Sequence, residues 1–108
     1  MIRLTRRRFS ATTIAALLFS GSARAATTHQ VTIRNMQFSP QSLNIRAGDI
    51  VEWTNRDSER HTATAADRAW DTGILKKGDS GQITFSAAGK FDYFCAVHPG
   101  MKASVTVT

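Results

Sequence analysis

Apolar side chains occupy every second position in a series of short runs, and residues typical of turns separate these runs. Val31 and Ile33 share one face of QVTIR, and Ile83 and Phe85 share one face of QITFS. A period of two places such side chains on one side of a β-strand. Further runs of this kind are SLNIR, IVEWT, FDYFC and SVTVT. The sequence therefore predicts an all-β antiparallel sandwich of about seven or eight strands.

The first 25 residues are typical of an export signal. MIRLTRRRFS is basic, the run from Ala11 to Phe19 is apolar, and Ala23-Arg24-Ala25 resembles a cleavage site. The apolar run is about half of the roughly 20 residues that span a bilayer, so we expect no stable membrane anchor. Thr5-Arg6-Arg7-Arg8-Phe9 resembles a twin-arginine signal, and an ordinary arginine-rich signal is the alternative. We predict that residues 1–25 are cleaved and that the protein is periplasmic.

Removal of this segment changes the charge of the chain. The whole chain carries 14 Lys and Arg against 8 Asp and Glu. Five basic residues and no acidic residue lie in 1–25, which leaves nine against eight, or +1, in residues 26–108. No basic cluster with interleaved aromatic residues remains, so no nucleic-acid partner is expected. The remaining 83 residues predict one small domain, in which a bound metal would help to stabilise a modest core.

The segment from Thr62 to Ser80 has a less regular pattern than its neighbours. A helical turn over Ala63–Ala69 fits its composition, and two glycine-containing turns follow. Aromatic residues on either side are candidates for the core, because large apolar rings are usually buried. These candidates are Trp53, Trp70, Phe85, Phe91 and Tyr93.

A thiol, an imidazole and a thioether follow one another at intervals of three residues near the C-terminus: Cys95, His98 and Met101. One cysteine cannot form an internal disulfide, and a free thiol in an exported protein needs another explanation. A thiolate suits copper or zinc, an imidazole suits both metals, and a thioether is a weak ligand for copper. Cysteine, two histidines and an axial methionine make up the blue-copper electron-transfer set. The loop supplies three members of that set.

The second histidine of such a set would be His61 or His29. His61 follows the predicted strand that carries Trp53, and its loop can lie at the same end of a sandwich as the loop after Cys95. His29 lies near the start of the predicted domain, where nothing in the sequence fixes its position. His61 is therefore the better placed of the two, and His29 is expected to be a surface histidine.

The chain resembles the cupredoxins of the plastocyanin/azurin group, and the amicyanins most closely. The resemblance covers LNIRAGDIVEWTNRD, then His61, then WDTGILKKGDSGQITFSAAGKFDYFC, then the compact C-x-x-H-x-x-M loop. It implies a Greek-key sandwich that binds one copper ion through His61, Cys95, His98 and Met101. It also implies one-electron shuttling between larger redox proteins, such as a dehydrogenase, a cytochrome or an oxidase.

Two positions depart from the pattern of this family. Many relatives have Asn directly after the first ligand histidine, where this chain has Thr62. They often have Thr or Ser after the cysteine, where this chain has Ala96. Those side chains commonly link the two ligand loops. Their replacement here bears on the rigidity and the reduction potential of the site, and not on its ligands.

Two other classes of function compete with an electron carrier. An enzyme would use Cys95 as a nucleophile and a histidine as its base, but the sequence lacks an oxyanion signature and an orienting Asp or Asn. A periplasmic copper carrier or store would favour Met-rich or paired-Cys sites that release the ion. One cysteine and one placed methionine favour a fixed copper ion. We therefore predict a monomeric electron carrier that is not an enzyme.

Electrons are expected to pass through the edge of His98. The small or rigid residues Ala96, Pro99 and Gly100 surround it in the predicted loop and add little bulk. Tyr93, two residues before the cysteine, offers a rival route along the strand.

Overall fold

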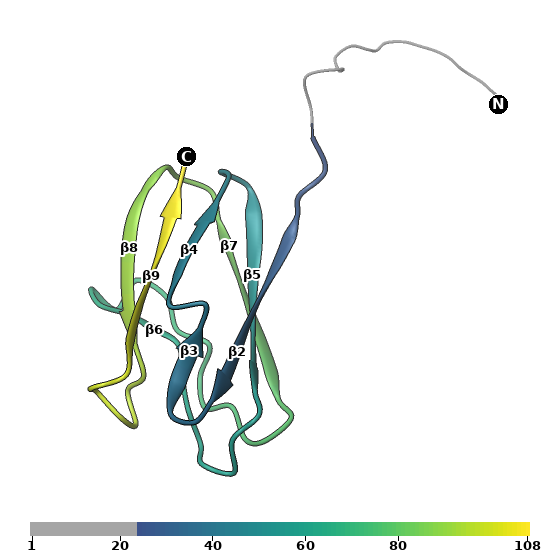
Figure 1. Cartoon of the computed structure of the whole chain (residues 1–108). Coiled ribbons are helices and arrows are strands. Elements are labelled where there is room, and N and C mark those ends of the chain that lie inside the picture. Colours follow the sequence, from purple (N-terminus) through teal and green to yellow (C-terminus); the bar gives the residue numbers. More distant parts are fainter. Residues whose placement is uncertain (1–23) are drawn as a thin grey trace, which may run out of the picture.

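Residues 24–108 of the computed structural model form eight β-strands in two stacked sheets and no helix, as Figure 1 shows. The structure describes these residues, and the predicted export signal lies outside them except for Arg24 and Ala25. No helix in the described part is long and apolar enough to cross a membrane. The predicted all-β sandwich is confirmed. The strands are β2 (Thr28–Arg34), β3 (Gln37–Ser39), β4 (Ser42–Ile45), β5 (Asp49–Asn55), β6 (Thr64–Ala65), β7 (Ser80–Phe85), β8 (Gly89–Phe94) and β9 (Lys102–Val107).

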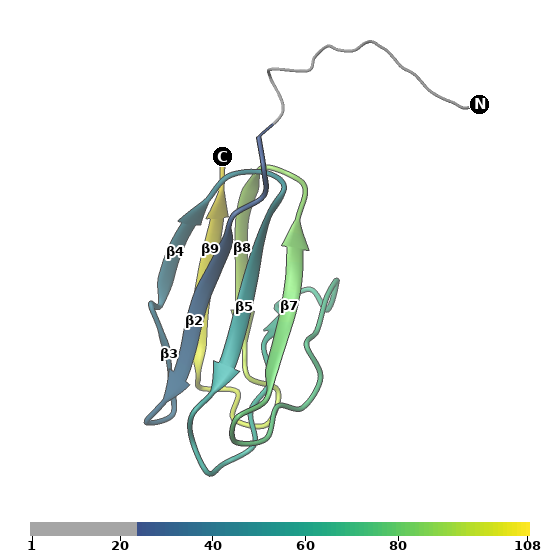
Figure 2. The same cartoon turned by 90° about the vertical axis from the view of Figure 1, so that its right-hand side faces the viewer.

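The two sheets contain both parallel and antiparallel neighbours. One sheet has the order β3-β2-β5-β7 and the other β4-β9-β8-β6, and Figure 2 shows them as two layers. Strand β2 runs parallel to β5, and β4 runs parallel to β9, while the other neighbours are antiparallel. The chain crosses to the second sheet after β3 and returns after β4, so β5 enters the first sheet alongside β2. The sheets are therefore mixed, whereas the sequence pattern predicts wholly antiparallel ones.

The inward faces of the two sheets meet in one core. Every second residue of β5 is buried, which is the pattern of a strand with one face in a core. Trp53 on β5 and Tyr93 on β8 are almost fully buried, and their rings lie edge to face with centroids 5.3 Å apart. Phe85 is buried as well, whereas Trp70 and Phe91 are partly buried and pack against the core. The five predicted aromatic residues thus all belong to the core or its margin.

Two short strands lie outside the runs that predicted strands from the sequence. Strand β3 has three residues and pairs with β2 across a tight turn. In that turn Asn35 and Met36 have φ angles of 54° and 59°, which a two-residue type I′ turn requires and which glycine usually supplies. Strand β6 has two residues and pairs with the end of β8. The helical turn expected over Ala63–Ala69 is wrong, because pairing with β8 keeps the first part of this segment extended.

The loops after β5 and β8 lie at the same end of the sandwich, which is the lower end in Figure 1. These two strands belong to different sheets, so the end of the molecule brings together segments 56–63 and 95–101. The turn between β2 and β3 lies beside them, since the N–H group of Arg56 donates to the carbonyl of Ile33 at 2.8 Å. We call this end of the molecule the loop end.

Candidate metal centre

The C-terminal loop consists of two consecutive turns. The N–H of His98 donates to the carbonyl of Cys95 at 3.2 Å, and the N–H of Met101 donates to the carbonyl of His98 at 2.9 Å. A third bond closes the loop, from the N–H of Cys95 to the carbonyl of Met101 at 3.0 Å. The three predicted ligands are therefore the end residues of two turns. This geometry explains their regular spacing of three residues.

The loop that carries His61 is held by its backbone and by one buried amide. His61 and Leu75 exchange two backbone hydrogen bonds of 3.1 and 2.7 Å. The side-chain amide of Asn55 donates to the carbonyls of Glu59 and Leu75 at 2.7 and 2.8 Å. Asn55 is fully buried, so these bonds satisfy a polar group that would otherwise be costly to bury. They fix the path of the chain from β5 to His61.

The structure brings His61, Cys95 and His98 together. The Sγ atom of Cys95 lies 3.7 Å from Nδ1 of His61 and 3.8 Å from Nδ1 of His98. The three donor atoms all lie within 4.8 Å of one another. Cys95 and His61 are fully buried, and His98 is partly exposed. Two imidazole nitrogens and one sulfur therefore converge beneath the surface of the loop end.

A carboxylate holds the outer nitrogen of His61. The Nε2 atom of His61 donates to Oδ2 of Asp57 at 2.9 Å, which leaves the lone pair of Nδ1 for a metal. Asp57 also accepts the N–H groups of Asn35 at 2.7 Å and Met36 at 2.9 Å. Burial opposes its charge, but the N–H groups of Met36 and Asn35 and the His61 ring together hold the pKa of Asp57 below its ordinary value.

Asp57 also changes the case for an enzyme. The sequence shows no orienting Asp for a Cys–His pair, and the structure corrects this, because Asp57 binds His61, whose Nδ1 atom lies 3.7 Å from Sγ of Cys95. The sequence gives no sign of this role, because the turn that positions Asp57 is distant along the chain. The thiol itself, however, has no exposed surface.

Thr62 links the loop of His61 to the loop of Cys95. Its N–H group donates to Sγ of Cys95 at 3.4 Å. Its hydroxyl accepts the N–H group of Ala96 at 2.8 Å. The threonine thus joins the residue after His61 to the residue after Cys95, although both positions depart from the family pattern. The loop end is consequently more rigid than the two replacements alone suggest.

Met101 and His29 have different surroundings. Met101 is buried, with 8% of its surface exposed, and its backbone is bonded to both Cys95 and His98. His29 lies in β2, where its Nε2 atom is 2.9 Å from Oδ2 of Asp49. It pairs in register with Val51, in the first half of β5, whereas His61 follows the last residue of that strand. His29 is therefore remote from the cluster.

The donor set fits copper better than a hard cation. Magnesium and calcium prefer several oxygen ligands, and the converging atoms here are one sulfur and two imidazole nitrogens. Copper and zinc accept this set, and a neighbouring methionine favours copper. The fold and the cluster together define a small β-sandwich metalloprotein with its metal centre at one end.

The family model for the cupredoxin-like domain matches residues 8–107, and the chain belongs to this family. Its homologues bind one copper ion, and His61, Cys95, His98 and Met101 form the candidate copper site. The resemblance drawn from the sequence is confirmed, and so is copper as the cofactor.

Similar proteins include the amicyanins. The amicyanin-alpha of Methylorubrum extorquens is 31% identical over 109 residues, covering 92% of this chain and 89% of that protein. The amicyanin of Paracoccus denitrificans is 32% identical over 82 residues, covering 71% of this chain and 63% of that protein, less than two thirds of its length. A solved structure of a reduced mutant of amicyanin superimposes with a TM-score of 0.72 at 28% identity. That superposition covers 83% of this chain and 90% of the amicyanin chain.

Proposed function

We propose that this protein carries single electrons in the periplasm through one copper ion held by His61, Cys95, His98 and Met101. The observation that supports it best is a buried thiol with two imidazole nitrogens, all within 4.8 Å. Bound copper alternates between Cu(I) and Cu(II), which supplies one-electron chemistry. The basic and apolar pattern of residues 1–25 supports the periplasmic location.

The chain's own residues keep the donor atoms in place. Two turns hold Cys95, His98 and Met101, and a pair of backbone bonds to Leu75 holds His61. The carboxylate of Asp57 fixes the tautomer and the ring orientation of His61. Ligands that move little between two oxidation states need little reorganisation, and this makes electron transfer fast.

The loop end supplies a surface for redox partners. His98 is partly exposed and lies among the exposed residues 96, 97, 99 and 100. Three large apolar side chains are exposed in the described part of the chain. Met36 lies in the β2–β3 turn, Val97 precedes His98, and Ile74 precedes Leu75, whose backbone is bonded to His61. Such a surface suits brief docking with a dehydrogenase, a cytochrome or an oxidase. Lys102, directly after Met101, would steer the encounter weakly. We expect a monomer.

An enzymatic role for Cys95 is disfavoured by its burial rather than by its partners. Cys95, His61 and Asp57 line up as a nucleophile, its base and an orienting carboxylate would. A nucleophile must reach its substrate, and the Cys95 side chain is 0% exposed. A copper store would instead release its ion. The backbone hydrogen bonds that close both ligand loops hold the donor atoms in place and do not favour release.

The visible spectrum of the copper-loaded protein tests this proposal. An intense sulfur-to-copper charge-transfer band is expected, and Cys95→Ser should abolish it. The control His29→Gln changes a histidine outside the cluster and should keep the band. A colourless protein that yields its copper to a modest chelator would indicate a carrier or store. A metal-free activity that is blocked by alkylation of Cys95 would indicate an enzyme. Either result would contradict electron transfer.

A further inference from the structure

A chain of hydrogen bonds leads from the loop of Cys95 to a carboxylate outside the cluster. The hydroxyl of Thr62, which accepts the N–H of Ala96, lies 2.8 Å from the hydroxyl of Thr64. The hydroxyl of Thr64 donates to Oδ1 of Asp71 at 3.1 Å. Both threonines are buried, with 4% and 1% of their surfaces exposed, and Asp71 is exposed. The chain therefore runs from the interior to the surface.

The carboxylate determines the direction of every bond in this chain. A hydroxyl has one proton to donate, and an ionised carboxylate only accepts. Because Thr64 gives its proton to Asp71, the bond between the two threonines must use the proton of Thr62. Only the lone pairs of the Thr62 oxygen are then left to meet the N–H of Ala96. Each donor in such a chain strengthens the next bond.

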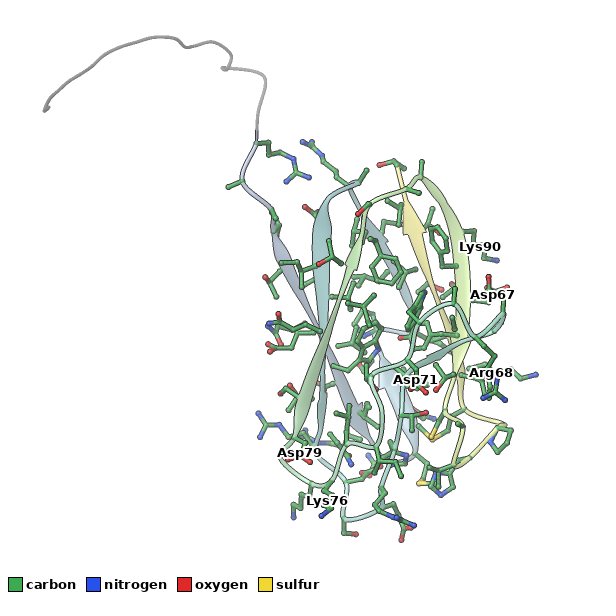
Figure 3. The ribbon with its side chains drawn as sticks, turned by 180° about the vertical axis from the view of Figure 1, so that it is seen from behind. Asp67, Arg68, Asp71, Lys76, Asp79 and Lys90 are labelled. Carbon is green, nitrogen blue, oxygen red and sulfur yellow. The ribbon has the colours of Figure 1, made fainter. Side chains whose placement is uncertain are left out.

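We propose that Asp71 is a remote positioning residue for the candidate copper site, and that it acts through Thr64 and Thr62 on the loop of Cys95. The inference rests on the proposed function only for its consequence at the copper ion, since the hydrogen bonds belong to the metal-free chain. Figure 3 shows Asp71 well above Lys76 and Asp79, which lie toward the lower end of the molecule. Its influence would pass through the two threonines rather than by contact with a ligand.

The consequence for the site follows from the double role of Thr62. Its hydroxyl holds the backbone of Ala96, and its N–H group points at the sulfur of Cys95. Hydrogen bonds around this sulfur tune the potential of a blue-copper site. If the bond between Thr64 and Asp71 is lost, the hydroxyl of Thr62 is no longer oriented toward Ala96. The loop of Cys95 is then held less firmly, and the bond to the sulfur weakens.

A competing explanation is that Asp71 only shapes its own turn. Its Oδ1 atom also accepts the N–H of Gly73 at 2.8 Å. Thr64→Val distinguishes the two roles, because it removes the hydroxyl from the chain and leaves the bond between Asp71 and Gly73 intact. Asp71→Ala removes both bonds. Thr64→Ser and Asp71→Asn keep the hydroxyl and an acceptor oxygen, and so serve as conservative variants.

Amide hydrogen exchange in the metal-free full chain, followed by NMR, is the direct test. In Thr64→Val and Asp71→Ala, exchange of the Ala96 N–H should accelerate severalfold, because its acceptor, the Thr62 hydroxyl, is no longer oriented. Loss of a whole hydrogen bond, roughly tenfold, sets the upper limit. The conservative variants should remain close to the original rate. Asp67→Ala is the matched control. Asp67 accepts the N–H of Ala69 in the neighbouring turn and is not bonded to Thr62, Thr64 or Asp71. When loaded with copper, Thr64→Val and Asp71→Ala should also show shifted copper–sulfur vibrational bands.

The same experiment can overturn the proposal. An unchanged Ala96 rate in both Thr64→Val and Asp71→Ala would contradict it. Acceleration in Asp71→Ala alone would assign Asp71 to its turn. An equal acceleration of exchange at the Val105 amide, which lies in β9 and takes no part in these hydrogen bonds, would indicate global destabilisation instead of positioning. Because exchange is measured without metal, failure of copper binding would contradict the proposed function and leave this result intact.

Discussion

The ring of His61 and the carboxylate of Asp57 form a 2.9 Å hydrogen bond at the loop end. The same carboxylate accepts the N–H groups of Asn35 and Met36, so it joins a predicted copper ligand to the turn between β2 and β3. The side chain of Asp57 is 13% exposed, which reduces the screening of its charge by water. A negative charge is thus fixed next to His61.

Replacing Asp57 by Ala should weaken copper binding and raise the reduction potential. The charge stabilises Cu(II) more than Cu(I), and loss of a hydrogen bond to a ligand histidine typically lowers metal affinity by about 10–100-fold. Competition with a chelator and potentiometry would measure both effects. Glu59→Gln is a suitable control, because it removes an exposed acid two residues further along the chain. Equal affinities and potentials in the two variants would contradict the role of Asp57.

The sequence predicted the parts of this molecule that depend on local patterns. The period of two located β5 and β8, whose buried faces carry Trp53 and Tyr93. Donor spacing predicted Cys95, His98 and Met101 as ligands, and the structure brings Cys95 and His98 together with His61, whereas the role of Met101 stays a prediction. The choice of His61 over His29 depended only on where a strand ends, and the structure places His61 at the cluster.

The features that the sequence did not predict depend on contacts between distant residues. Asp57 binds His61 only because the β2–β3 turn, about twenty residues earlier, presents two N–H groups to it. Thr62 links the two ligand loops because its hydroxyl accepts the N–H group of Ala96, which lies 34 residues further along the chain. The parallel pairing of β2 with β5 follows from two crossings between sheets, and alternation within a strand carries no information about crossings.

Met101 should tune the candidate site rather than create it. A thioether is a weak axial ligand that favours Cu(I) over harder donors. Met101→Gln should therefore retain copper and lower the reduction potential, which cyclic voltammetry would measure. The exposed Met36 provides a control, since Met36→Gln introduces the same side chain outside the loop. An unchanged potential in Met101→Gln would show that Met101 is not the axial ligand.

Asp49 should stabilise the fold in a pH-dependent way. The hydrogen bond from the His29 ring is the largest of the contacts that hold the pKa of Asp49 well below its ordinary value, followed by the N–H of Thr27. The unfolded chain takes up the proton first, near the ordinary pKa of about 3.9. The stabilisation is therefore complete above about pH 4 and declines as the pH falls below that value.

Urea unfolding of Asp49→Asn would measure this effect. The variant should be less stable than the original chain at pH 7, and the difference should shrink below about pH 4. Asp67→Asn, a change at an exposed acid, should leave the unfolding midpoint nearly unchanged. A difference that stays constant from pH 7 to low pH would contradict the role of the carboxylate charge.

Export through the twin-arginine route remains a prediction about residues outside the described part of the chain. Replacing Arg6, Arg7 and Arg8 by Lys keeps the positive charge and removes the pattern that a receptor reads. The precursor should then accumulate in the cytoplasm, as cell fractionation would reveal. Arg3→Lys lies outside the pattern and should export normally. Normal export of the triple variant would rule this route out.

The last prediction concerns the path of the electron. His98 is the partly exposed member of the cluster, whereas Cys95, His61 and Tyr93 are buried. Its imidazole therefore offers a short covalent path from the surface, and burial makes a direct entrance at Tyr93 unfavourable. Pro99 follows His98 and is exposed, so Pro99→Glu places a charge on the apolar surface next to the ring edge.

This charge should leave the visible spectrum nearly intact, since Pro99 is not a predicted ligand. Two molecules that exchange electrons through this surface would bring the two introduced carboxylates together, and like charges at an interface are strongly unfavourable. Electron self-exchange should slow by about tenfold or more. Ser86→Glu adds the same charge beyond the end of β7, away from the loop end, and should have little effect. An intact spectrum combined with unchanged self-exchange and partner rates in the Pro99 variant would contradict transfer through His98 and would leave the strand route through Tyr93 as the path.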